Sequence, residues 1–172
     1  MKKTCAILLT LVLTLSLASA ALADTIGLGV VTGIASSKAA TAEADGVGQV
    51  DTAICTVSVD DKGVITAVLF DTAQTKVTFN AKGEITADLT AEYPSKYEKG
   101  DAYGMKKASP IGKEWFEQID ALVAYCTGKT MDEVLAGVKD GAAVDEDLKA
   151  GATMHLNDLI AALQKAYDAA TK

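Results

Sequence analysis

The residues with the most distinctive chemistry lie near the C-terminus, in the segment DLKAGAT that runs from Asp147 to Thr153. Thr153 brings a hydroxyl group beside two small residues, Gly151 and Ala152, directly before a strongly periodic apolar segment. Thr153 is therefore either an ordinary residue of a tight turn or the attachment point of another group.

Other kinds of site chemistry have little support in the sequence. The single histidine is His155, and there is neither a Cys-x-x-Cys pair nor a histidine cluster, so we expect no structural metal. A Ser-His-Asp or Cys-His site would have to recruit His155, and the residues around it offer no such arrangement. We therefore predict no catalytic residue.

Residues 1–23 have the pattern of a secretory signal peptide. Two lysines precede a long apolar run, and Ala21-Leu22-Ala23 forms an A-x-A cleavage site before Asp24. The alternative is an uncleaved membrane anchor. We expect cleavage, a secreted or cell-envelope location outside the cytoplasm, and no membrane insertion after cleavage.

Charge narrows the partners of the exported chain. The whole sequence has a net charge of −7, from 23 acidic and 16 basic residues, and loss of the two leader lysines makes it −9; the sequence contains no arginine. An acidic surface without arginine argues against nucleic acid and against anionic membrane surfaces. It also removes the side chain best suited to a bidentate grip on phosphate. A bound phosphate would need lysine, backbone amides or a covalent bond.

Two cysteines, Cys55 and Cys126, remain after loss of the leader. Cys55 belongs to a predicted strand and Cys126 to the end of a predicted helix, so a disulfide between them is geometrically possible. Free thiols are equally compatible with an exported chain whose redox compartment is not known. The sequence leaves both states open.

The front half of the chain predicts β-structure. After a Gly-, Ala- and Thr-rich lead-in at residues 24–46, "VGQVDTAICTVSV" alternates like a half-buried strand. "DDKG" predicts a hairpin turn in which Gly63 takes positive φ, and "VITAVLFD" is the return strand. "TKVTFN", the turn "NAKG" and "EITADL" predict a second hairpin.

The back half predicts helices. Residues 90–112, with both prolines and three tyrosines, form a long loop that either lines an aromatic slot or folds over the sheet. "KEWFEQIDALVAYC" predicts a helix with Trp115 facing the core and Gly128 just past its end. "TMDEV" predicts a short helix opened by a capping box, "KDGAAVDED" a loop, and residues 156–170 a last helix capped by Asn157 or Asp158. The fold class is α+β, an antiparallel sheet built from hairpins with helices packed on one side.

The segment Asp147 to Thr153 resembles the flavinylation motif of the FMN-binding domain family, written Asp-x-x-[Ser/Thr]-Gly-Ala-[Thr/Ser]. This family includes flavoprotein subunits of sodium-translocating NADH:quinone reductases and Rnf complexes, and exported bacterial flavoproteins. "VDTAICTVSVDDKGVITAVLFD", "EKGDAYG…EWFEQ…GKT" and "AGATMHLNDLIAALQKA" are also similar to the family's strand, loop and closing-helix segments. The resemblance covers roughly residues 47–170, so residues 47–172 are expected to form an FMN-binding-like domain. Ala150 departs from the motif, which prefers Ser or Thr there.

The resemblance implies a cofactor and partners. In the family, a flavin transferase joins FMN through its phosphate to the hydroxyl of the last motif residue, which here is Thr153. Asp147, Gly151 and Ala152 match the other motif positions, with small residues leaving room for the transferase and the nucleotide. Trp115, Tyr93, Tyr97 and Tyr103 are candidates to stack on the flavin, although core or loop packing is the alternative for each. The implied function is extracytoplasmic electron transfer with a membrane redox partner protein. The alternative is a flavin-free domain that acts as a cell-envelope binding or interaction module.

Overall fold

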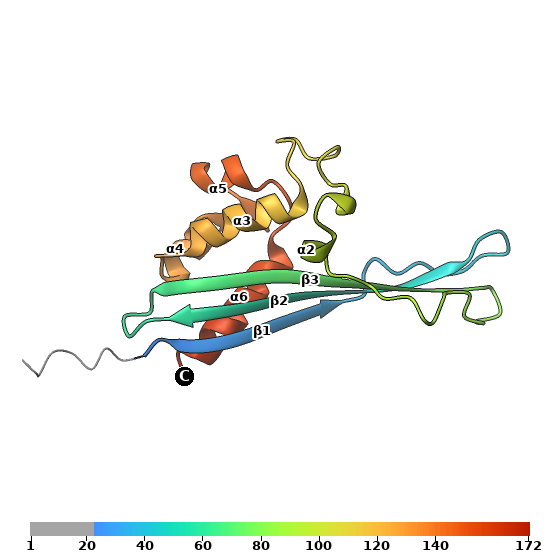
Figure 1. The fold of residues 1–172 in the computed structure, drawn as a ribbon, viewed down its shortest axis with the longest axis horizontal. Coiled ribbons are helices and arrows are strands. Elements are labelled where there is room, and N and C mark those ends of the chain that lie inside the picture. The colour runs from blue at the N-terminus through green and yellow to red at the C-terminus, as the bar shows by residue number, and fades with distance from the viewer. Residues whose placement is uncertain (1–22) are drawn as a thin grey trace, which may run out of the picture.

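A computed structural model describes residues 23–172, which form an α+β fold. Its main sheet has three antiparallel strands in the order β1-β2-β3: β1 (Thr25–Gly33), β2 (Gly46–Val59) and β3 (Ile65–Phe79) (Figure 1). The predicted turn joins β2 to β3, and Gly63 has a φ of 79° there. The Asp60 carboxylate accepts hydrogen bonds from the amides of Lys62 and Val64, which fixes the turn.

The helical half follows the sheet in the sequence. Its elements are α2 (Lys96–Lys99), the 3₁₀ helix η1 (Gly100–Tyr103), α3 (Trp115–Cys126), α4 (Met131–Ala136), the two-residue strands β4 (Val138–Lys139) and β5 (Ala142–Ala143), α5 (Glu146–Gly151) and α6 (Asn157–Ala170). The predicted capping box of α4 is present, since Thr130 and Glu133 exchange hydrogen bonds. Gly128 has a φ of 83° just beyond α3, as its position predicts.

The last helix lies directly on the glycines of β1. A Cβ atom added to Gly27 would fall 1.8 Å from the carbonyl oxygen of Ala166, and one added to Gly29 would fall 1.9 Å from that of Ala162. Small residues on both sides therefore let the helix backbone touch the strand backbone. This contact places α6 over β1 and β2, on one face of the sheet.

The hydrophobic core lies between this face of the sheet and helices α3 and α6. Its strand residues include Cys55, Val57, Val68 and Phe70, and its helix residues include Trp115, Ile119, Leu122, Leu159 and Leu163. Leu148 and Leu156 anchor α5 and the start of α6 in the same core. In the described part of the chain, every buried side-chain nitrogen or oxygen has a hydrogen-bond partner.

Residues 24–46, which we expected to lead into the domain, instead contribute strand β1. All nine residues of β1 pair with β2, from Thr25 opposite Val59 to Gly33 opposite Asp51. The sheet therefore begins well before residue 47. The signal-peptide prediction concerns residues that lie, apart from Ala23, outside the described part.

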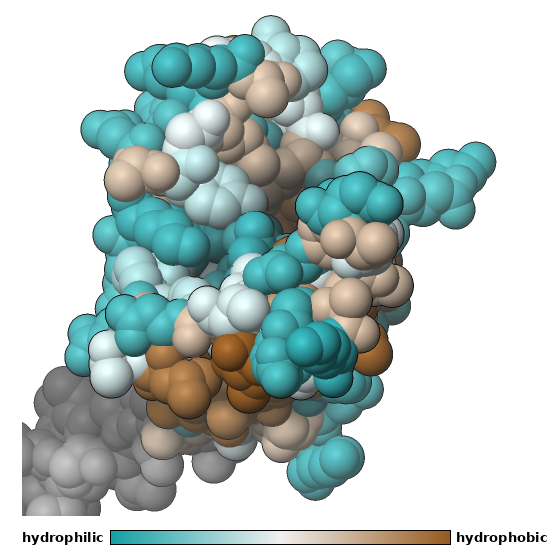
Figure 2. All heavy atoms as spheres, turned by 90° about the vertical axis from the view of Figure 1, so that its right-hand side faces the viewer, coloured by the Kyte–Doolittle hydropathy of each residue, from teal (hydrophilic) through white to brown (hydrophobic). Residues whose placement is uncertain are grey.

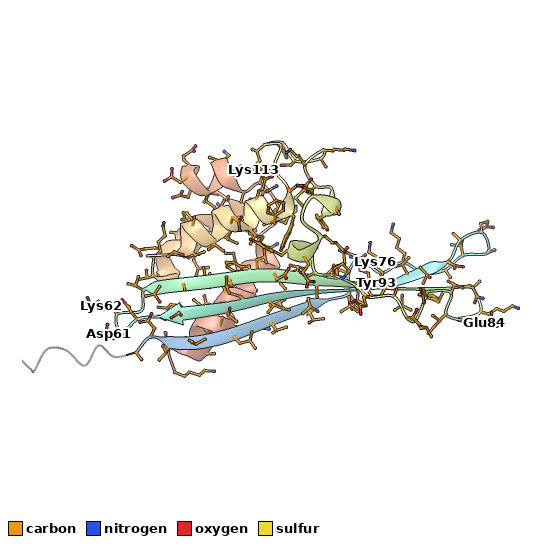
Figure 3. All side chains as sticks on the ribbon, in the orientation of Figure 1. Asp61, Lys62, Lys76, Glu84, Tyr93 and Lys113 are labelled. Carbon is orange, nitrogen blue, oxygen red and sulfur yellow. The ribbon has the colours of Figure 1, made fainter. Side chains whose placement is uncertain are left out.

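The predicted second hairpin-like unit forms only as a short turn at the end of a longer strand. β3 is one continuous strand that pairs with β2 from Ile65 to Phe79, so "TKVTFN" extends the first hairpin. The turn after Asn80 forms, but its return segment adds only an isolated bridge between Phe79 and Ile85. The two strands therefore continue beyond the helices as a long arm (Figure 1). Glu84 lies near the tip of this arm, and Asp61 and Lys62 lie at the opposite end of the molecule (Figure 3).

Two smaller predictions in the helical half also need correction. The stretch "KDGAAVDED" holds β4, β5 and the N-cap Asp145, whose carboxylate accepts from the amides of Asp147 and Leu148. Neither Asn157 nor Asp158 caps α6: the N-cap is Leu156, and no side chain bonds to the cap. Within residues 23–172, no helix combines the length and apolarity needed to cross a membrane.

Candidate functional site

Thr153 lies in the turn between α5 and α6, with its side chain exposed to solvent. The backbone amide of Thr153 donates to Oε1 of Gln118 at 2.9 Å, and the amide of Met154 donates to the same oxygen at 3.1 Å. A side chain of α3 therefore holds the turn by its backbone. The threonine hydroxyl stays free to face solvent.

Gln118 is buried to 1% exposure and connects three segments. Its Nε2 donates to Oγ of Ser109 at 3.2 Å and to the carbonyl oxygen of Lys113 at 3.3 Å, both in the loop before α3. Such a fully bonded buried amide fixes the parts that it joins, because any movement would leave its polar atoms unpaired. The position of Thr153 is thus tied to α3 and to the loop before it.

The motif residues divide into an exposed and a buried set. Asp147, Ala150 and Thr153, spaced three residues apart, are exposed, whereas Gly151 and Ala152 are buried. A Cβ atom on Gly151 would lie 2.5 Å from Cβ of Ala121 in α3. The small size of Gly151 therefore serves close contact between α5 and α3. It does not open a path to the backbone for a transferase, contrary to our expectation.

A cavity of about 330 Å³ lies beside the start of α6. It is lined by Ser36, Gln49, Asp51, Ala53, Thr72, Gln74, Lys96, Trp115, His155, Asn157, Asp158 and Leu159. The volume lies at the lower end of the range for small-molecule sites, about 300–1,000 Å³. His155, two residues after Thr153, is exposed and reaches the lining, but Thr153 itself does not. Thr153, the candidate attachment position, therefore lies next to the cavity.

Two of the predicted aromatic residues meet next to this cavity, and one of them, Trp115, lines it. Tyr103 and Trp115 form an edge-to-face pair with ring centroids 6.4 Å apart. Lys96 Nζ lies 5.3 Å from the centroid of Tyr103 and 5.8 Å from that of Trp115, within the range of cation–π attraction. Trp115 is only 3% exposed and belongs to the core, so it offers the cavity one edge of a packed ring.

The carboxylate of Asp51, held by two hydrogen bonds, also lines the cavity. Gln49 Nε2 donates to Oδ2 of Asp51 at 2.7 Å, and Gln74 Nε2 donates to Oδ1 at 2.8 Å. Burial raises the pKa of Asp51, but the hydrogen bonds from Gln74 and Gln49 and the charge of Lys96 outweigh it and bring the pKa below its usual value. The lining of the cavity therefore combines a fixed negative charge, Asp51, with a positive one, Lys96.

The other predicted residues lie away from this cavity. Asp147 borders a different hollow, with Ala121, Ala124, Tyr125 and Lys129. Tyr97 donates its hydroxyl to Asp120 at 2.9 Å and packs edge-on against Phe116, so it covers the side of α3. Tyr93 is 41% exposed at the base of the arm (Figure 3). The structure thus brings together Trp115 and Tyr103 but neither Tyr93 nor Tyr97.

Cys55 and Cys126 are free thiols, both buried in the core. Burial raises the pKa of each to about 12, so both stay protonated and unreactive near neutral pH in the folded chain.

No group of three or more His, Cys, Asp or Glu side chains within residues 23–172 is arranged to hold a metal ion.

Three parts of this site were not predicted from the sequence: Lys96, Gln118 and the hydrogen bonds around Asp51. Gln118 could have been predicted, because it shares the inward face of α3 with Trp115 and Leu122 at helical spacing. A polar residue at such a position has to find buried partners. No sequence pattern points to Lys96 or Asp51, because a lysine in a predicted loop and an acidic residue in a strand are ordinary surface residues.

Comparisons with known proteins give a limited match. No family model matches the chain, and no solved structure matches it. A stretch of 42 residues, 24% of the chain, is 50% identical to a protein of Desulfitobacterium hafniense described as a chlorophenol reductase. The matched stretch spans 13% of that protein's length, so its activity belongs to a much larger chain.

Proposed function

We propose that this protein is a small exported flavoprotein that carries one FMN on Thr153 through a phosphoester and serves extracytoplasmic electron transfer. The observation that carries the proposal is the exposed Thr153 hydroxyl on a turn whose backbone is fixed by Gln118. A modifying enzyme can reach such a hydroxyl, and the motif positions 147 and 150 are exposed with it.

The surroundings of Thr153 suit a phosphate-bearing aromatic group. Helix α6 begins without a side-chain cap, so the amides of its first turn are open to an external acceptor such as phosphate. The adjacent cavity offers Trp115 as an apolar wall and Lys96 as the cation. When bound, the isoalloxazine would supply the electron-transfer chemistry, while these side chains orient it and set the charge around it.

The attachment step is a nucleophilic substitution at phosphorus, and the Thr153 hydroxyl is the nucleophile. The hydroxyl oxygen bonds to the phosphorus of an activated flavin nucleotide, here a flavin dinucleotide, whose pyrophosphate bond breaks. The hydroxyl proton is lost and a nucleoside monophosphate leaves, so the chain gains FMN less one water. A covalent link suits an exported chain without arginine, because a dissociable flavin would be lost to the medium.

The second candidate is a flavin-free domain of the same fold that acts as a binding module in the cell envelope. Ala150 favours it, because the motif has a hydroxyl residue at this exposed position. A flavin transferase that requires a hydroxyl group at this position would modify the natural chain poorly.

Intact mass spectrometry after co-expression with a flavin transferase and export tests the proposal. We expect the mass of one FMN less water on the natural chain, none on Thr153→Ala, and full addition on Thr153→Ser. Thr171→Ala, which removes an exposed hydroxyl at the other end of α6, should be modified like the natural chain. Ala150→Ser should raise the modified fraction where modification of the natural chain is partial.

An unmodified mass for both the natural chain and Ala150→Ser, beside a control flavoprotein modified in the same cells, would contradict the flavoprotein proposal. Thr153 would then be a turn residue, and the interaction module would be the remaining candidate.

A further inference from the structure

The helices leave one face of the sheet uncovered. Gly27 and Gly29 of β1 face α6, so the alternate residues Ile26, Leu28 and Val30 face the other way. These three side chains are 77%, 58% and 42% exposed. A row of large apolar side chains in water is unusual for a sheet face and indicates a surface that is covered in use.

The strand register continues this apolar surface across the sheet. Leu28 lies opposite Thr56, which lies opposite Leu69, and Val30 lies opposite Ile54. Leu69 is 71% exposed on the strand at the far edge. Each strand therefore contributes at least one large apolar side chain to the centre of the face, and the charged residue there is Asp71 on β3, opposite Ile54.

Hydrogen-bonded polar groups close both ends of the face. At one end the hydroxyl oxygens of Thr32 and Thr52 lie 3.2 Å apart. At the other end the Asp24 carboxylate accepts hydrogen bonds from the hydroxyls of Ser58 and Thr66. An apolar centre inside a polar rim is the usual anatomy of a protein interface.

The same face carries a groove beside β3. Helix α3 runs along this edge, and Ile119 and Val123 line a hollow of about 370 Å³ together with Ile54, Leu69 and their neighbours. The hydrogen bond between Tyr97 and Asp120 joins two further lining residues. A smaller hollow of about 150 Å³ lies between Ile26 and Leu69. The face therefore has a ridge on β1 and recesses along β3.

We propose that a second copy of this chain covers this face, forming a symmetric dimer in which the β1 ridge of each subunit fills the groove beside β3 of the other. A twofold axis parallel to the strands turns one sheet over onto the other and places β1 above β3 twice. Ridge and groove lie on one face of one chain, so this rotation satisfies both at once.

Size favours the second copy, and the face itself carries little charge. Residues 24–172 hold 14 lysines and 23 acidic residues, a net charge of −9. The outward strand positions between the rims nevertheless carry one charged side chain, Asp71, whose carboxylate accepts from the Tyr97 amide, so two acidic copies can meet here without opposing many like charges. Nine strand residues span about 30 Å, and three strands with the flanking helix about 24 Å, which gives about 700 Å² per subunit. Standard interfaces bury about 800 Å² per partner.

Sedimentation of the exported protein over a wide concentration range tests the dimer. We expect a reversible monomer–dimer equilibrium, and a dissociation constant at least about tenfold higher for Leu28→Asp and for Leu69→Lys. Ile85→Asp changes an equally apolar residue on the arm, outside this face, and should leave the equilibrium unchanged. Far-UV circular dichroism confirms that each variant is folded.

Mixing the two variants separates this geometry from other causes of dissociation. In a mixed dimer, one contact places the introduced carboxylate opposite the introduced ammonium group, and the other contact keeps both natural leucines. A 1:1 mixture of Leu28→Asp and Leu69→Lys should therefore associate more tightly than either variant alone. A protein that stays monomeric at every concentration overturns the proposal, as does a dimer that both variants leave intact. Failure of the mixture to associate excludes the ridge-in-groove arrangement.

Discussion

At the scale of single residues, the cavity beside α6 depends on how Asp51 is held. Two amide side chains, from Gln49 and Gln74, each donate to a different oxygen of this carboxylate. Hydrogen bonds to an ionised acceptor are worth about 1.5–3 kcal/mol, more than those between neutral groups. Asp51 therefore stabilises the base of the arm and also sets the negative side of the cavity.

The first prediction is that Asp51→Asn lowers the unfolding free energy by about 1–3 kcal/mol at neutral pH, because the amide cannot replace a charged acceptor for two donors. The folded-state pKa of Asp51 lies below its usual value. Its contribution is therefore present above the unfolded pKa of about 3.9 and is lost as the pH falls through the folded pKa. Urea unfolding of both proteins at pH 7 and at about pH 3 should show the difference shrinking in acid.

Asp61→Asn is the matched control, since Asp61 is an exposed residue of the β2–β3 turn. It should change stability by less than about 0.5 kcal/mol. A deficit in Asp51→Asn that stays constant across this pH range would contradict the role given to the ionised carboxylate.

At the scale of elements, the contact between α6 and β1 shows why the sequence predicts some parts of this fold and not others. The β2–β3 turn and helix α3 follow from local patterns: a glycine at a turn, and apolar residues at helical spacing from Trp115 to Cys126. β1 does not, because two of its inward positions, Gly27 and Gly29, are glycines and give no apolar alternation. These glycines are needed because the backbone of α6, which begins more than 120 residues later in the chain, packs directly against them.

In the candidate site, too, local patterns predict some residues and distant contacts determine the others. The motif predicts the exposed Thr153, and Trp115 and Tyr103 do meet, but the cavity that Trp115 lines is completed by Lys96 and by strand residues such as Asp51. These residues come from segments far apart in the sequence. No local pattern predicts which polar side chains the sheet and helices bring to one place.

The second prediction is that Gly29→Ala destabilises the protein by about 1–3 kcal/mol, the usual cost of forcing extra atoms into a well-packed contact. The new Cβ atom would lie 1.9 Å from the carbonyl oxygen of Ala162, so strand and helix would have to separate. Gly33→Ala, at the end of the same strand, meets no atom within 4 Å and should have little effect. Equal loss of stability in the two variants, measured by thermal unfolding, would show that the helix contact is not the cause.

At the scale of the whole molecule, the sheet extends past its helices as an arm and leaves one face open. Hydrophilic residues cover the upper part of the arm end of the molecule, and hydrophobic residues gather in its lower part (Figure 2). Exposed apolar residues at this end include Ile34, Ile85 and Leu89. The helical side holds the candidate cofactor site, and the open face holds the proposed dimer contact, so the two roles occupy separate surfaces.

The last prediction concerns where the exported chain begins. We expect cleavage after Ala23, because signal peptidase requires small residues at the two alanines of Ala21-Leu22-Ala23. Cleavage there keeps Asp24, whose carboxylate accepts a hydrogen bond from Ser58 at 3.1 Å, and Thr25, which pairs with Val59. Mass spectrometry of exported protein should therefore give a chain that starts at Asp24. Ala23→Asp should block processing and retain the precursor, whereas Leu22→Ala, between the two required positions, should be processed normally. Exported material that begins at Met1 or Lys2 would refute this cleavage and the location assigned to the protein.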